Sequence, residues 1–124
     1  MALAPDGSLW VVSGNIPPWG KAYDNVNYGA TIVHINSSNG SVIATINGLQ
    51  RPRGLAISSS NSLYVAEDGT DQNFKIYSNV NSLSGNVTPI PTNFGVVGGV
   101  FQGTGSAVGT MGPLRFNHPM GELG

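Results

Sequence analysis

Two aromatic side chains, a cation and a carboxylate gather in one short segment, residues 16–24 (IPPWGKAYD). Trp19 and Tyr23 offer flat rings that can stack on a sugar or a peptide, while Lys21 and Asp24 can bind its polar groups. The structural alternative is that Trp19 only covers its own loop. We take these four side chains as candidate ligand-binding residues.

Three carboxylates, Glu67, Asp68 and Asp71, lie close together in the sequence. Carboxylates gathered at the end of a strand can bind a hard cation or act as a general base. The alternative is that Glu67 has a purely structural role. Glu67 and Asp68 are therefore further candidates for ligand binding.

The two histidines, His34 and His118, have no second histidine, cysteine or carboxylate at the spacing of a metal site. His34 lies in an apolar run, where strand alternation points it at a neighbouring sheet or at solvent. His118 remains a candidate ligand-binding residue. No serine stands in a nucleophile elbow and the chain has no cysteine, so the sequence assigns neither a catalytic residue nor a metal ligand.

The composition excludes some partners. The formal net charge is −1 and 9% of the residues are charged, so no basic surface is available for nucleic acid. No targeting segment and no membrane span are expected, because no apolar run is long enough. Low charge with abundant Gly, Asn, Ser and Thr is typical of exported bacterial β proteins and favours an extracellular or periplasmic location. Glycosylation triplets occur at Asn36, Asn39 and Asn86, as chance produces readily in such a chain.

The elements that must position these side chains are predicted to be strands. Apolar runs are short, rich in β-branched and aromatic residues, and interrupted by Gly, Pro, Asn and Asp. The pairs at residues 6–7 (DG) and 39–40 (NG) suit tight turns that need positive φ. The sequence therefore predicts an all-β chain, with strands near residues 8–13, 30–36, 41–46, 53–58, 62–67, 73–78 and 86–90.

An internal repeat refines this prediction. Residues 3–12 (LAPDGSLWVV) recur as residues 55–66 (LAISSSNSLYVA), and the interval between the copies suits a four-stranded unit with an insertion. A second echo relates residues 49–54 (LQRPRG) to residues 116–121 (FNHPMG). Proline can open a strand without breaking a ladder, and glycine permits close approach at a crowded centre. Each copy of the second echo therefore opens a unit, and Leu49 and Phe116 are expected to pack between neighbouring units.

The unit that starts at Leu49 carries a pattern formed by Leu49, Pro52, Gly54, Leu55, Ala56, Asn61, Tyr64, Val65, Ala66, Asn73 and Ile76. This pattern resembles the NHL repeat of the six-bladed β-propeller superfamily, which also contains gluconolactonase-like and TolB-like proteins. Glu67 and Lys75 replace the usual Asp and Arg of the repeat, and the resemblance implies that they form an ion pair at the surface or at a rim, worth at most about 1 kcal/mol.

The resemblance implies β-propeller blades, each a four-stranded antiparallel meander, with about two blades and the start of a third. Blade 1 is expected at residues 1–48, blade 2 at 49–91, a Gly-rich connection at 92–115 and the start of blade 3 at 116–124. Two blades leave raw sheet edges. The remaining blades are therefore expected in the same longer chain, or identical copies close a ring as a homo-oligomer, three copies giving six blades.

In such meanders the long connections share one end of the blades, here residues 14–29, 47–52, 68–72 and 91–118. His118 would lie there at the rim of the central channel. Because binding residues concentrate on loops held by a rigid scaffold, this long-loop end is the expected site.

Two functions fit this pattern. The leading hypothesis is a non-catalytic binding or scaffold module, without a cofactor, for a peptide, glycan or protein partner. The alternative is part of a metal-dependent, lactonase-like hydrolase or lyase, in which a divalent cation such as Ca²⁺ would be held largely by other blades. Few ionisable groups converge in this chain, which favours binding over catalysis.

Overall fold

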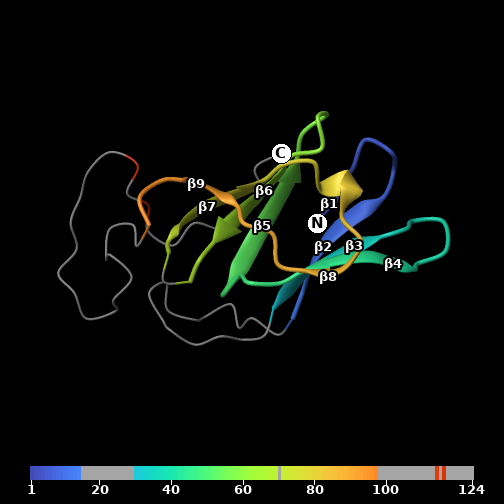
Figure 1. The fold of residues 1–124 in the computed structure, drawn as a ribbon, viewed down its shortest axis with the longest axis horizontal. Helices are drawn as coiled ribbons and strands as arrows, with labels where there is room; N and C mark the ends of the chain where they lie inside the picture. Colours follow the sequence, from blue (N-terminus) through green and yellow to red (C-terminus); the bar gives the residue numbers. More distant parts are fainter. Residues whose placement is uncertain (15–29, 70, 98–113, 115, 117–124) are drawn as a thin grey trace.

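The computed structural model describes residues 1–14, 30–69, 71–97, 114 and 116. These residues form two small β-sheets and one short 3₁₀ helix, so the prediction of an all-β chain is confirmed (Figure 1). The elements are β1 (Ala2–Leu3), β2 (Leu9–Ser13), β3 (Thr31–Ile35), β4 (Val42–Ile46), β5 (Pro52–Ile57), β6 (Leu63–Glu67), β7 (Asn73–Tyr77), η1 (Val80–Ser82), β8 (Gly85–Val87) and β9 (Thr92–Phe94).

Each sheet contains a four-stranded antiparallel meander. In the first sheet β1, β2, β3 and β4 are neighbours in chain order, and β2 pairs with β3 from Leu9 with Ile35 to Ser13 with Thr31. In the second sheet the order is β5, β6, β7 and β9. The registers place the ends of β2, β4 and β6 and the starts of β3, β5 and β7 at one end of the molecule. The connections from β2 to β3, from β4 to β5 and from β6 to β7 therefore leave and rejoin the sheets at that end, as expected.

The core lies between the two sheets. Strand alternation turns one face of each sheet inward, and Trp10 of the first sheet and Leu63 of the second are both fully buried. Leu49 is 5% exposed and belongs to the same cluster, so its expected position between neighbouring units is confirmed. The inward-facing cluster comprises Ala2, Ala4, Trp10, Ile32, Ile46, Leu49, Leu55, Leu63, Val65, Tyr77 and Val80.

The prediction that residues 86–90 form the last strand of the second meander is wrong. β8 leaves that sheet and pairs in parallel with β4 of the first sheet, with Ile46 opposite Val87. β9, inside the stretch expected to be a connection, completes the second meander beside β7. The cause lies just after β7, where Asn79 takes a left-handed φ of 53° and Val80 is fully buried, which turns the chain toward the first sheet.

Residues 79–91 thus form a strap across the seam between the two sheets. Its two ends are fixed by backbone hydrogen bonds: the N–H of Val80 donates to the carbonyl of Asn61 at 3.1 Å, and the N–H of Asn47 donates to the carbonyl of Val87 at 2.8 Å. Such bonds join segments from both meanders. The strap therefore connects the β5–β6 turn of the second sheet to the β4 edge of the first.

Replacing Leu63 by Ala tests the packing of the sheets. Leu63 has no exposed surface, so the cavity left behind should reduce the free energy of unfolding by about 2–5 kcal/mol in urea denaturation. The matched control is Val42→Ala on β4, where the side chain is 61% exposed and the change should stay within about 0.5 kcal/mol. Equal effects of the two substitutions would contradict this core.

Candidate functional site

A cleft of about 460 Å³ opens at the long-loop end of the molecule. The connection from β4 to β5 forms one wall and the end of the strap forms another, while β6 and β7 supply the floor. Gly48 has a left-handed φ of 97°, and a Cβ there would lie 2.9 Å from the Thr88 methyl group, so glycine permits the two walls to meet. The lining consists of Asn47, Gly48, Leu49, Gln50, Glu67, Asp71, Lys75, Tyr77, Thr88, Pro89, Ile90, Pro91 and Asn93.

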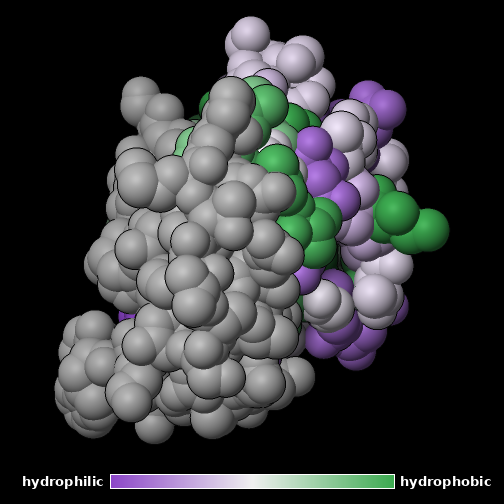
Figure 2. Space-filling view, turned by 90° about the vertical axis from the view of Figure 1, so that its left-hand side faces the viewer, coloured by the Kyte–Doolittle hydropathy of each residue, from purple (hydrophilic) through white to green (hydrophobic). Residues whose placement is uncertain are grey.

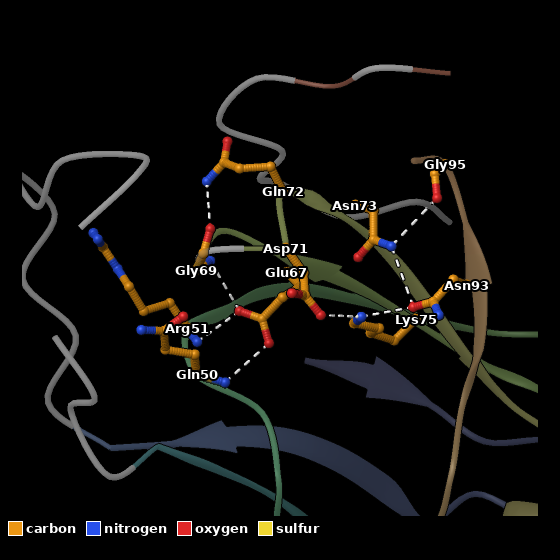
Figure 3. A network of polar contacts seen from close by, with 10 residues as sticks. All are labelled: Gln50, Arg51, Glu67, Gly69, Asp71, Gln72, Asn73, Lys75, Asn93 and Gly95. Atoms are coloured by element: carbon orange, nitrogen blue, oxygen red, sulfur yellow. Dashed lines mark hydrogen bonds and ion pairs between the residues drawn. The ribbon is translucent and has the colours of Figure 1, made fainter. Parts of the chain in front are cut away.

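Glu67 is the buried carboxylate of this site, with 2% of its surface exposed. Its Oε2 accepts a hydrogen bond from the N–H of Gln50 at 3.0 Å, and its Oε1 accepts from the N–H groups of Arg51 at 2.6 Å and Gly69 at 3.0 Å (Figure 3). Buried N–H groups need such acceptors, because an unpaired one costs free energy. Glu67 therefore ties both the β4–β5 connection and the β6–β7 turn to the end of β6.

Lys75 has a different partner from the one expected. Its Nζ donates to Asp71 Oδ2 at 2.5 Å and to Asn93 Oδ1 at 2.6 Å (Figure 3). The prediction of a surface ion pair between Glu67 and Lys75 is therefore wrong, because the nearby turn brings Asp71 to the ammonium group and the backbone N–H groups occupy Glu67. Burial raises the pKa of the Glu67 carboxyl, and the backbone N–H groups and the Lys75 charge oppose that rise only in part.

Asp68 follows Glu67 but does not line the cleft. It is fully buried, and its Oδ2 lies 3.1 Å from Arg53 Nε and 3.8 Å from Arg51 Nη2. Its Oδ1 accepts from Gln72 Nε2 at 3.3 Å. Alternation along the chain explains the separation, since successive side chains at a strand end leave in opposite directions. The two adjacent carboxylates therefore have different partners: Glu67 binds backbone N–H groups, and Asp68 binds arginine side chains.

Asn93 and Asn73 are site residues that sequence reasoning missed. Asn93 Oδ1 accepts from both Lys75 Nζ and Asn73 Nδ2, the latter at 3.2 Å, and Asn73 Nδ2 also reaches the carbonyl of Gly95 at 3.4 Å. Asn73 is one of the residues that match the repeat, so the sequence pattern already indicated its place at the start of β7. No sequence pattern pointed to Asn93, because its segment was expected to be a connection rather than a strand.

The structure does not describe the other predicted site residues. Trp19, Lys21, Tyr23, Asp24 and His118 lie outside the described residues. Glu67 is the predicted residue that lines the cleft, and Asp68 lies behind it. Within the described ranges, no three His, Cys, Asp or Glu side chains gather as a metal site would require.

His34 lies at the opposite end, among the short turns, and is buried against Trp10. The two rings are stacked with centroids 4.1 Å apart and an interplanar angle of 8°. His34 Nε2 lies 2.6 Å from Ser8 Oγ, which in turn lies 2.5 Å from Asp6 Oδ1. Because the hydroxyl donates to the carboxylate, Nε2 must donate to the hydroxyl. The serine therefore lies between the acid and the imidazole, whereas in a nucleophilic triad the imidazole lies between the acid and the serine and accepts the serine proton. The Asp6–Ser8–His34 contacts are structural.

No protein-family model, curated protein or solved structure matches this chain. In the part of the chain that the structure describes, no helix has the length and apolar character needed to cross a membrane. The fold and the site therefore define an all-β, two-sheet protein with a cleft of mixed polar and apolar lining at its long-loop end.

Replacing Glu67 by Gln tests its role as a buried acceptor. An amide offers one acceptor and turns an NH₂ group toward a backbone N–H, so the free energy of unfolding should fall by about 1–3 kcal/mol. The isosteric control Asp71→Asn removes a carboxylate that is 39% exposed and should cost less than about 1 kcal/mol. A larger effect at Asp71 than at Glu67 would contradict this arrangement.

The pH dependence of stability tests the burial of His34. Desolvation lowers the pKa of the imidazole below its ordinary value of 6.5, more than the Asp6 carboxylate raises it. Below pH 6.5 the unfolded chain therefore binds a proton at this imidazole that the folded chain does not, and the contribution of His34 to the free energy of unfolding should decrease as the pH falls.

Urea denaturation between about pH 5 and pH 7 measures this slope. His34→Gln should flatten it relative to the unsubstituted chain, whereas His118→Gln, at the other histidine of the chain, should leave it unchanged. If the slope instead disappears with His118, the titrating group is not the buried imidazole at Trp10.

Proposed function

We propose that this chain is part of an NHL-type β-propeller and acts as a non-catalytic binding module for a peptide, glycan or protein partner. Two observations support the blades. The repeated Leu-aromatic-Val triplets lie at equivalent places in β2 and β6, each the second strand of a four-stranded meander. The two meanders also pack face to face around one core, as neighbouring blades do.

The cleft is the observation that carries the binding function. Its volume of about 460 Å³ lies within the range of ligand pockets. The floor is fixed by the hydrogen bonds of Glu67 and Lys75, so little ordering remains to be done when a ligand enters. The floor is thus preformed beneath a rim of residues 88–91, which lowers the entropic cost of binding a ligand.

The chemical character of the lining suits neutral polar ligands. The side-chain amides of Asn47, Gln50 and Asn93 can each donate and accept hydrogen bonds, as peptide groups and sugar hydroxyls also do. Lys75 is neutralised by Asp71 beside it. Ile90 is 96% exposed at the rim, where it offers an apolar contact. Such a lining favours a peptide or a glycan.

Binding is favoured over catalysis because the carboxylates at this end already have strong partners. Glu67 is held by three backbone N–H groups, and Asp68 lies between two arginines. A general base must accept a proton from its substrate at an accessible atom. Both carboxylates are buried among donors, so each is suited to shaping the end of the sheet.

Screening the chain against a glycan array and a displayed peptide library, followed by calorimetric titration of the hits, tests this function. Ile90→Asp at the rim should weaken a hit about tenfold or more, because it puts a charge on the apolar contact. Asn93→Leu should do the same by removing an amide from the lining.

The control for this experiment is Ser38→Asp, which puts an equal charge on an exposed turn at the opposite end. It should bind as the unsubstituted chain does. Unchanged affinity of the hits for both cleft variants would remove the cleft from the site, and retention of no glycan and no peptide would count against the binding function.

A further inference from the structure

The interface inside the chain joins two different kinds of sheet face. Trp10 lies on the inward face of the first sheet, and Leu63 and Val65 lie on the inward face of the second. In the repeat, however, Trp10 corresponds to Tyr64 and not to Leu63 or Val65. The inward face of one sheet is therefore equivalent to the outward face of the other.

The outward face of the second sheet is an aromatic surface. Tyr64, Phe74, Ile76 and Phe94 line a shallow hollow of about 230 Å³ there, and Phe94 is 49% exposed. Tyr64 stands at the position of Trp10, which fills the interface inside the chain. Figure 2, seen from the β9 side of Figure 1, shows hydrophobic side chains at the surface of the described part of the molecule, next to polar ones.

Phe116 packs on this aromatic surface. It packs edge-on against Phe74 with ring centroids 5.0 Å apart, and its ring lies 6.0 Å from that of Phe94. In the repeat, Phe116 corresponds to Leu49, which lies in the interface between the two sheets. The outward face of the second sheet thus receives the same element of the repeat as the inward face of the first.

The outward face of the first sheet is aliphatic at its centre, with Ser13, Thr31 and Thr45 beside the aliphatic residues. Leu9, Val11, Val33 and Ile35 alternate with buried residues along β2 and β3 and are half-buried. Leu9 and Val11 correspond in the repeat to Leu63 and Val65, which form the other side of the internal interface. These four residues and the aromatic ones of the second sheet carry no charge, so their association would bury no unpaired ion.

We propose that copies of this chain associate head to tail, the aliphatic outward face of one copy packing on the aromatic outward face of the next. The chain then makes between molecules the same face-to-face contact that it makes within itself. Such a contact is heterologous, since it joins two different surfaces, and it generates a closed ring or an open filament. The inference does not depend on the ligand of the cleft.

Variants that block one face each provide the test. Val33→Glu puts a charge on the aliphatic face, and Phe94→Glu puts one on the aromatic face at an exposed position. Size exclusion with light scattering should show that the unsubstituted chain forms assemblies of two or more copies, each copy contributing 12.8 kDa. Each variant alone should have the mass of one copy, with circular dichroism showing that the strands are retained.

An equimolar mixture of the two variants should form a complex of two copies, about twice 12.8 kDa, because each supplies the face that the other has lost. Ser38→Glu, on a turn outside both faces, should keep the mass of the unsubstituted chain. A folded monomer or an unfolded chain without substitution would overturn the proposal. A mixture that stays at the mass of one copy would also overturn it.

Discussion

The buried carboxylate of Glu67 is the contact on which the long-loop end depends. One side chain accepts hydrogen bonds from Gln50 and Arg51, which lead into β5, and from Gly69, which leads into β7. Desolvation of a carboxylate is costly, and the raised pKa of Glu67 reflects that cost. The three N–H groups offset it by giving the carboxylate the donors that water would otherwise supply. Together with the bond from the Asp68 N–H to the Arg51 carbonyl at 2.9 Å, this contact fixes the two connections to each other and to the end of β6.

The cleft and the packing of the sheets follow from that anchor. Leu49 immediately precedes the tied residues and is buried in the core, so fixing the connection also fixes an apolar contact between the two meanders. The strap closes the other side by pairing β8 with β4 and returning to β7 through β9. Lys75, Asp71 and Asn93 complete the floor between these two walls. Both walls of the cleft are thereby attached to the sheets.

Local patterns in the sequence predicted the strands, whereas contacts between distant residues escaped prediction. Period-two alternation placed β2, β3, β6 and β7 within a residue or two, because one face of each strand is buried. The same alternation identified a strand near residue 86 but not its partner, which depends on the left-handed turn at Asn79 and the burial of Val80. Likewise, the repeat put an acid at the end of β6, but its burial depends on a connection that folds back from residues 47–51. The loop with Trp19 and Tyr23 lies outside the described residues, so its role stays a prediction.

Residue-resolved amide hydrogen exchange tests the anchor most directly, because exchange reports whether each backbone N–H is held. The amides of Gln50, Arg51 and Gly69 should be protected to a similar degree, although none lies within a strand. The amides of Ser59 and Ser60, in an exposed turn, should exchange rapidly. Exchange of the first three at the rate of the exposed turn would contradict the account, because Glu67 would then hold neither connection.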